Sequence, residues 1–131
     1  MESLVDYTLI TNEIRLVNHH IEGDRFVIDP QLRREIKRID ESKSAVTYFL
    51  EICNTPEKPF PIDLYVSITG IFDVSRIEKE SIDDFLHVQT CQILFPQIRT
   101  IVANLTASAL MPPILLPVVD ARKLFSSENK E

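Results

Sequence analysis

The chain has 131 residues, of which 44% are hydrophobic and 26% are charged, a composition typical of one folded domain rather than of a disordered chain. Its 14 Lys and Arg against 20 Asp and Glu give a formal net charge of -6, and no block of basic residues offers a face that would neutralise phosphates. We therefore expect no nucleic-acid partner.

Neither a membrane span nor a disulfide framework is indicated. No signal peptide precedes the first periodic segment, and no apolar run approaches the ~20 residues that a membrane helix requires. The two cysteines, Cys53 and Cys91, lie in segments with a buried pattern. These features predict a protein of a reducing, cytoplasmic compartment that does not insert into a membrane.

Alternation of apolar and polar residues predicts strands at the start of the chain. Residues 7–17 alternate without interruption, which places Ile10, Asn12 and Ile14 on one face. After a break that contains Gly23, residues 26–28 predict a short extended piece that ends at a proline.

Residues 31–39 fit either a helix or a strand. Leu32, Ile36 and Ile39 are spaced for one helix face, whereas a strand needs a bulge to keep all three inward. Residues 44–53 and 61–71 then predict two strands, because β-favouring side chains recur in them at a period of two. One face of the last strand mixes polar and aromatic groups, which predicts an antiparallel sheet covered on one side only.

From Ser81 onward the pattern is helical. Ser81 with Asp84 resembles an N-cap followed by acidic first-turn residues, and an apolar stripe continues at helical spacing as far as Ala109. Pro96 predicts a kink or the start of a second helix. Residues 121–125 predict a last short helix before a charged, frayed tail, 126–131. Strands followed by helices predict an α+β fold in a single domain, residues 1–125.

The apolar segment from Leu110 to Val118 fits neither kind of element. It is as apolar as a buried strand, yet its three prolines prevent it from pairing like an interior strand. Such a segment must be covered by its own domain, by a partner subunit or by another chain.

Catalytic and metal-binding constellations are absent from the sequence. The pair His19-His20 lacks a second ligand cluster at workable spacing, and Cys53 lies in an apolar, β-rich segment that favours an inert thiol. His87 is interpreted as a helix-surface or interface residue. Asp83 and Asp84 diverge by ~100° on a helix and do not share a site. We therefore expect no enzyme, no metal and no cofactor.

Three motifs resemble the family of the protein-export chaperone SecB. The string Ile93-Leu94-Phe95-Pro96, followed by Ile98-Arg99, is similar to the family's Ile-Leu-Phe-Pro-x-Ala-Arg core. Gly70-Ile71-Phe72 is similar to the family's Gly-Ile-Phe, and the segment from Met111 to Phe125 resembles its proline-flanked loop and final helix. The resemblance is specific from about Leu64 to Phe125. It departs at Thr90-Cys91-Gln92, where the family has Cys-Pro-Asn.

The resemblance implies a fold, an assembly and a function. The fold is a four-stranded antiparallel sheet with a crossover between strands 1 and 2, then a long helix and a short C-terminal helix. The assembly is a dimer or a dimer of dimers, with the long helices between two sheets. The function is to hold unfolded or partly folded client polypeptides without ATP, which in the family serves protein export. A client-binding groove or assembly interface is implied for apolar residues of the helix and the loop: Leu94, Phe95, Ile98, Val102, Leu110, Met111, Pro112, Pro113, Ile114, Leu115 and Leu116.

The resemblance to the export function is weaker on the outer face of the sheet. Family members dock the export motor SecA through acidic residues there. Glu13 matches one of these positions, whereas Val17 and Tyr65 replace the other two. The loss of these charges removes most of the electrostatic steering toward such a partner. Two alternatives therefore stay open: a general holdase, or a chaperone dedicated to one partner such as an antitoxin.

Overall fold

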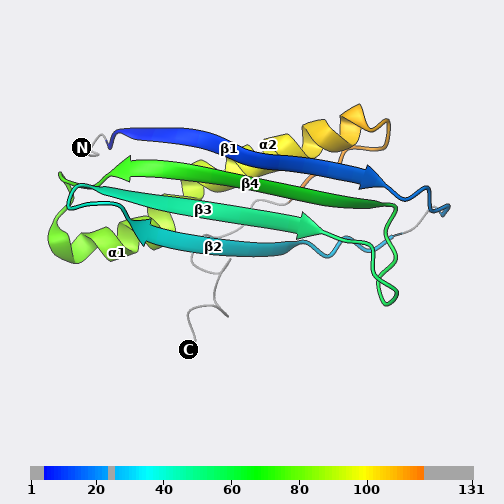
Figure 1. The fold of residues 1–131 in the computed structure, drawn as a ribbon, viewed down its shortest axis with the longest axis horizontal. Coiled ribbons are helices and arrows are strands. Elements are labelled where there is room, and N and C mark those ends of the chain that lie inside the picture. The colour runs from blue at the N-terminus through cyan, green and yellow to red at the C-terminus, as the bar shows by residue number, and fades with distance from the viewer. Residues whose placement is uncertain (1–4, 24–25, 117–131) are drawn as a thin grey trace.

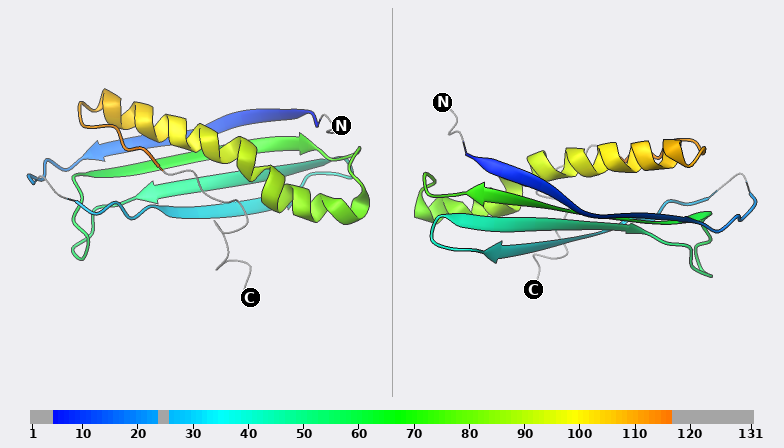
Figure 2. Two further views of the ribbon diagram at one scale, coloured as in Figure 1. Left: turned by 180° about the vertical axis from the view of Figure 1, so that it is seen from behind. Right: turned by 45° about the horizontal axis from the view of Figure 1, so that its top comes forward.

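The fold is one antiparallel sheet with a helical layer on one of its faces (Figures 1 and 2). The structure is a computed structural model that describes residues 5–23 and 26–116, and the statements below concern those residues. The strands are β1 (Tyr7–Asn18), β2 (Gln31–Arg38), β3 (Lys43–Ile52) and β4 (Ile62–Asp73). Their order is β1-β4-β3-β2, so the connection from β1 to β2 crosses the sheet. The predicted α+β fold and its crossover are confirmed.

The core lies between the sheet and the helical layer. Alternate side chains of β3 and β4 point into it and are at most 1% exposed: Val46, Tyr48, Leu50, Ile52, Ile62, Leu64 and Val66. The opposite face of these strands carries Thr47, Glu51 and Asp63, which are half-buried or exposed. The prediction of a sheet covered on one side is confirmed, and the covered face is set by the period-two pattern.

Strand β1 departs from the predicted alternation because it contains a bulge. The pairing of β1 with β4 shifts between Thr11 and Glu13, so Leu9 and Ile14 share the inner face while Ile10 faces outward. The extra residue, Asn12, donates hydrogen bonds from Nδ2 to Ser67 Oγ (3.1 Å) and Thr69 Oγ1 (2.8 Å) on the outer face. A bulge adds one residue and reverses the phase of the strand, which simple alternation does not reveal.

Residues 31–39 resolve as a strand, β2, without a bulge. Leu32 and Ile36 point inward from it and pack against the core. Ile39 lies beyond the end of β2 and is 50% exposed, so it needs no inward position. The extended piece predicted at residues 26–28 forms no strand. Phe26 instead packs edge-on against Phe60, with ring centroids 5.9 Å apart.

The helical segment is bent, as predicted. It comprises a 3-10 turn η1 (Lys79–Ser81), a single helical turn α1 (Ile82–Asp84), a π-turn η2 (Phe85–Gln89) and the helix α2 (Cys91–Ser108). Pro96 lies inside α2, and the irregular turns precede it. The predicted N-cap at Ser81 forms no side-chain hydrogen bond. The predicted short helix at 121–125 and the tail 126–131 lie outside the described residues.

The packing of the Phe72 ring explains why position 70, near the end of β4, is a glycine. A Cβ at Gly70 would lie 2.6 Å from the ring of Phe72 and 3.2 Å from Leu9 Cδ2. The Phe72 ring packs back over this position and contacts Tyr7 and Phe85, with centroids 5.6 and 5.9 Å away. Only a residue without a side chain allows this close approach.

Candidate functional site

Four of the predicted site residues on α2 are buried within a single chain. Leu94, Ile98 and Val102 are 0% exposed and Phe95 is 8% exposed, and all four belong to the core against the chain's own sheet. Their positions at helical spacing explain the burial, since they share the stripe of α2 that faces the sheet. They can support a groove from beneath, but in a single chain they present little surface to a partner.

The segment after α2 folds back along the helix as an ordered strap, residues 110–116. Thr106 Oγ1 accepts a hydrogen bond from Ile114 N (2.9 Å), and Arg99 Nε donates one to Leu116 O (2.8 Å). Ile114 and Leu116 are each 5% exposed, whereas Leu115 is 78% exposed. The strap therefore buries alternate side chains in its own core and presents Leu115 to the outside.

A groove lies where the strap begins, beside the connection between β1 and β2. Its volume is about 760 Å³. One wall comes from the crossover and the other from the end of α2 and the first strap residues. Its lining residues are Asn18, His20, Ile21, Glu22, Gly23, Phe26, Pro61, Ile62, Ala109, Leu110, Met111 and Pro112. We call this feature the crossover groove.

The crossover groove brings together only part of the predicted set. Leu110, Met111 and Pro112 line it, and Leu110 is 92% exposed. Leu94, Phe95, Ile98 and Val102 do not line it, nor do Pro113, Ile114, Leu115 and Leu116. Sequence reasoning missed the wall formed by residues 18–23 and Phe26, where the signal was only a break in the strand pattern around Gly23. A long crossover has no periodicity of its own from which a site can be inferred.

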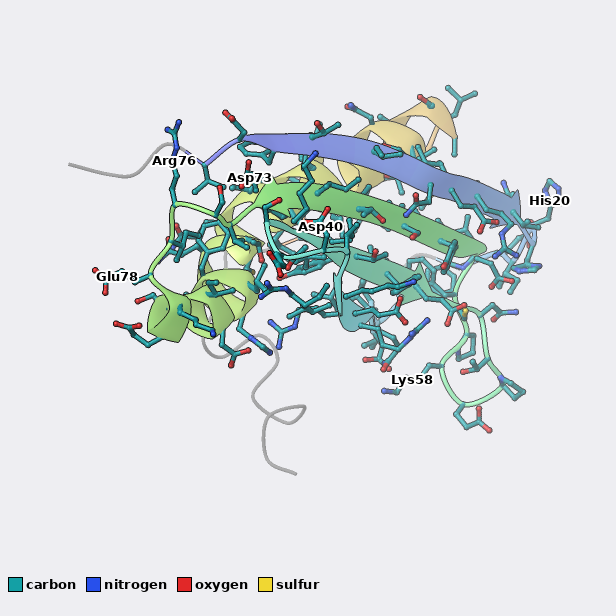
Figure 3. The ribbon with its side chains drawn as sticks, turned by 60° about the vertical axis from the view of Figure 1, so that its left-hand side comes forward. His20, Asp40, Lys58, Asp73, Arg76 and Glu78 are labelled. Atoms are coloured by element: carbon teal, nitrogen blue, oxygen red, sulfur yellow. The ribbon has the colours of Figure 1, made fainter. Side chains whose placement is uncertain are left out.

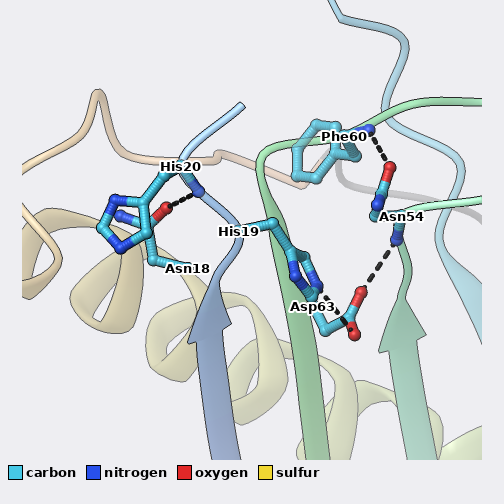
Figure 4. A network of polar contacts seen from close by, with 6 residues as sticks. All are labelled: Asn18, His19, His20, Asn54, Phe60 and Asp63. Carbon is cyan, nitrogen blue, oxygen red and sulfur yellow. Dashed lines mark hydrogen bonds and ion pairs between the residues drawn. The ribbon is translucent and has the colours of Figure 1, made fainter. Parts of the chain in front are cut away.

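A polar network fixes the base of the crossover wall (Figure 4). His19 Nε2 lies 3.0 Å from Asp63 Oδ2, and Asp63 Oδ1 accepts a hydrogen bond from Asn54 N at 2.8 Å. Asn54 Oδ1 in turn accepts one from Phe60 N at 3.0 Å. The hydrogen bond from the Asn54 backbone, followed by that from His19, lowers the pKa of Asp63. The end of β1 is thereby tied to the turn between β3 and β4.

The outer face of the sheet carries the two predicted docking residues, Glu13 and Tyr65. The guanidinium of Arg15 lies 5.2 Å from the centre of the Tyr65 ring, and its Nε lies 3.3 Å from Glu13 Oε2. Arg15 thus pairs with the one acidic residue that was retained and stacks on the aromatic residue beside it. Arg15 is thus a cation between Glu13 and Tyr65, and Glu51 of β3 lies opposite Tyr65 on the same face.

Charged side chains gather at the end of the sheet opposite the crossover groove. Figure 3 shows Asp73, Arg76 and Glu78 at that end, and His20 at the other. Hydrogen bonds from the Ser75 side chain and backbone lower the pKa of Asp73. These charged side chains therefore lie away from the crossover groove.

The cysteines offer no activated nucleophile. Cys91 is buried as predicted, and burial raises the pKa of its thiol. Cys53 is exposed, which corrects the sequence prediction: it lies one residue beyond β3, on the side of the outward-facing Glu51. Desolvation, and next the Glu51 carboxylate, raise the pKa of Cys53. A raised pKa disfavours the thiolate at neutral pH.

Within residues 5–23 and 26–116, no three His, Cys, Asp or Glu side chains are grouped to hold a metal ion. Over the same part of the chain, no helix is long and apolar enough to cross a membrane.

The chain is similar to proteins of one family. The model of the protein family described as preprotein translocase subunit SecB matches residues 20–131. The protein-export protein SecB of Chromobacterium violaceum is 30% identical over 105 residues, which cover 79% of this chain and 69% of that protein. An uncharacterized protein of Methanocaldococcus jannaschii is 28% identical over 67 residues, which cover 51% of this chain and 43% of that protein. The chain thus spans less than half of the archaeal relative.

A solved structure has the same fold. It is the SecB-like chaperone Rv1957 of Mycobacterium tuberculosis in complex with a ChAD peptide from the antitoxin HigA1. The TM-score is 0.71 over 88% of this chain and 91% of that one, at 16% sequence identity. The family match over residues 20–131 covers far more than half of the chain, so the protein belongs to the SecB family.

Proposed function

We propose that this protein is an ATP-independent holdase that binds extended, apolar segments of non-native polypeptides in the crossover groove. The observation that carries this proposal is the position of the apolar side chains that the fold leaves uncovered. Leu110 is 92% exposed at the lip of the groove, and Ile21, Phe26 and Met111 line its interior. Apolar surface binds non-directionally, so such a groove tolerates many client sequences.

The predicted site residues divide into two roles under this proposal. Leu110, Met111, Pro112, Pro113 and Leu115 offer partly or fully exposed surface along the strap. The buried residues Leu94, Phe95, Ile98, Val102, Ile114 and Leu116 hold the helix and the strap in place beneath that surface. Substitution of a buried residue would then affect binding through the fold rather than through a lost contact.

We also propose that the chain assembles as a dimer or a dimer of dimers. Ile14 and Tyr7, on the inner face of the edge strand β1, remain 46% and 49% exposed. The exposed side of α2 carries Gln92, Pro96, Thr100 and Asn104. The one charged residue of α2 is Arg99, which is half-buried. A long edge strand and an uncharged helix face both favour contact with a second copy.

A dedicated chaperone for a single partner is the second candidate. It is favoured by the contacts of Arg15 with Glu13 and Tyr65, because the one acidic residue at the three docking positions implied by the resemblance is paired with a cation. The similar mycobacterial chaperone was solved with an antitoxin peptide, which supports a client of that kind here. In either case we place the protein in the cytoplasm, consistent with its two free cysteines.

Aggregation assays test the holdase proposal directly. The full chain, at a stoichiometric ratio to a chemically denatured reporter protein, is expected to suppress light scattering without nucleotide. Unchanged scattering with several unrelated reporters would exclude a general holdase. Affinity purification from lysate then separates the candidates: one dominant stoichiometric partner favours the dedicated chaperone, and a mixture of non-native chains favours the holdase.

A further inference from the structure

His19 stands where the edge strand β1 ends and the wall of the crossover groove begins. Its backbone N–H donates a hydrogen bond to Pro61 O at 2.8 Å, and its side chain approaches Asp63 Oδ2 to 3.0 Å. The residues on either side of it, Asn18 and His20, line the groove. Figure 4 shows the side chains of His19 and His20 pointing apart, so His19 contacts the sheet while its neighbours form the wall.

The chain leaves the sheet directly after His19, and it does so in an unfavourable backbone conformation. His20 has a φ angle of 56°, in the left-handed region that residues with a Cβ rarely adopt. Its backbone N–H donates to Asn18 Oδ1 at 2.7 Å, which supports the turn locally. A strained residue of this kind persists only where the contacts around it hold the chain in place. His19 supplies two such contacts, one from its backbone and one from its imidazole.

The carboxylate of Asp63 connects His19 to a second part of the same wall. A carboxylate only accepts hydrogen bonds, so His19 Nε2 is the donor, and Asp63 Oδ1 accepts a second bond from Asn54 N at 2.8 Å. Asn54 Oδ1 in turn accepts from Phe60 N at 3.0 Å. Phe60 is 4% exposed, and its ring packs edge-on against Phe26, which lines the groove. Both the start of the wall and Phe26 are therefore attached through one carboxylate.

We infer that His19 is a positioning residue of the crossover groove: it holds the wall from the outer face of the sheet, through Asp63, without touching the client. This inference rests on the proposed function of the groove. Loosening of the wall leaves fewer molecules with a formed groove, and the apparent affinity for a client falls by the same fraction. The His19 and Asp63 side chains are 32% and 44% exposed, so water screens their contact, and we expect a moderate effect rather than a loss of folding.

Two substitutions of His19, made in the full chain, separate its hydrogen bond from its bulk. Leucine has no donor, whereas the side-chain amide of glutamine can still donate to Asp63. Binding of a client should weaken about three- to tenfold in His19→Leu and stay within about twofold of wild type in His19→Gln. Asp73→Asn is the matched control and should leave the affinity unchanged. Asp73 is the carboxylate at the other end of β4, which is also held by hydrogen bonds but lies away from the groove.

Affinity and local order are measured separately. Affinity comes from the fluorescence anisotropy of labelled ribonuclease A that has been reduced and carbamidomethylated, so that it stays unfolded. Hydrogen exchange at single amides, followed by NMR, distinguishes the wall from the core. The amide of residue 19 should exchange faster in His19→Leu than in wild type and in His19→Gln. The amide of Ile98, a core residue that is 0% exposed, should exchange at the wild-type rate in all of them.

Wild-type affinity in His19→Leu would overturn the inference. Equal weakening in both variants, with unchanged exchange at residue 19, would mean that the imidazole contacts the client directly, and would also overturn it. Faster exchange at Ile98 in His19→Leu would show that His19 supports the whole fold rather than the wall, which contradicts the inference as well. If the wild type does not bind the probe, the proposed function is refuted, and exchange at residue 19 still decides whether His19 holds the wall.

Discussion

Removal of one hydroxyl group, in Thr106→Val, should loosen the strap that forms one wall of the crossover groove. Thr106 is 0% exposed, and its Oγ1 accepts the hydrogen bond from Ile114 N at 2.9 Å. Valine keeps the shape of the side chain but offers no acceptor. Because Ile114 is only 5% exposed, water does not readily replace the hydroxyl.

The expected loss of stability in Thr106→Val depends on whether the strap stays in place or detaches. If the strap stays in place, a buried N–H without an acceptor costs about 1–3 kcal/mol. If the strap detaches, Ile114 and Leu116 become exposed, at about 1.5–3 kcal/mol for each side chain. The chain adopts the response with the lower free energy, so we expect a loss of about 1–3 kcal/mol. With a denaturant slope of ~2 kcal/mol/M, the urea midpoint falls by about 0.5–1.5 M.

Hydrogen exchange at the Ile114 amide shows whether Thr106→Val loosens the strap itself or destabilises the whole protein. Thr106→Ser is the matched control, because it retains the hydroxyl and loses only a methyl group, worth about 0.8 kcal/mol. The Ile114 amide should exchange slowly in wild type and in Thr106→Ser, and fast in Thr106→Val. This account of the strap would be refuted if the Ile114 amide exchanged slowly in all three proteins and the free energy of unfolding of Thr106→Val lay within about 0.5 kcal/mol of wild type.

Three further predictions concern the rest of the fold. The lowered pKa of Asp63 means that its charged form stabilises the folded state at neutral pH, and that this contribution is lost as the pH falls from the unfolded value of about 3.9 through the folded pKa. Asp63→Asn should therefore lower the urea midpoint at pH 7, and the difference between the two proteins should shrink as the pH falls below about 4; a constant difference would contradict the assignment. Ile98→Asp places a charge at a position that is 0% exposed and should abolish folding or assembly, so unchanged circular dichroism and gel filtration would show that the helix stripe is misassigned. Gly70→Ala forces the Phe72 ring away from a Cβ at 2.6 Å and should destabilise by about 1–3 kcal/mol in urea denaturation, whereas a neutral effect would mean that the ring relocates freely.

The strands whose pattern is set by burial could be predicted from the sequence. In β3, Val46, Tyr48, Leu50 and Ile52 alternate with half-buried or exposed residues, and all four are at most 1% exposed. The same holds for β4 except at Ser67, which is buried on the outer face. In a central strand the sequence pattern closely reflects burial, because each inward side chain is fully enclosed. The helix stripe of Leu94, Ile98 and Val102 was predictable for the same reason.

Edge elements gave weaker signals because only part of their surface is buried. In β1, the bulge at Asn12 reverses the phase, and the residue that causes it has no distinctive pattern. In β2, Arg34 points inward among apolar neighbours and donates from Nη1 to His87 O at 3.0 Å. A half-buried arginine among apolar inward positions breaks the alternation that would otherwise identify a strand. The helix and strand alternatives for residues 31–39 were equally compatible with such a pattern.

The crossover groove could be predicted only on its strap side. Leu110, Met111 and Pro112 belong to an apolar, proline-rich run that stands out in the sequence, and the resemblance to SecB assigned them a role. The opposite wall, formed by residues 18–23 and Phe26, is aperiodic, and it reaches the groove because β1 lies at the far side of β4 from β2. Such a juxtaposition depends on topology, which local pattern does not encode.

The prolines of the strap explain how it remains ordered while leaving Leu110 exposed. Between Leu110 and Ile114 the backbone has three N–H donors, since Pro112 and Pro113 have none. Leu110 N and Met111 N donate to the carbonyls of Ala107 and Thr106, and Ile114 N donates to the Thr106 hydroxyl. Every donor of this stretch is thus satisfied by the end of α2, and the prolines restrict the chain further. A client that contacts Leu110 therefore meets a surface that is already ordered, so less conformational entropy is lost when it binds.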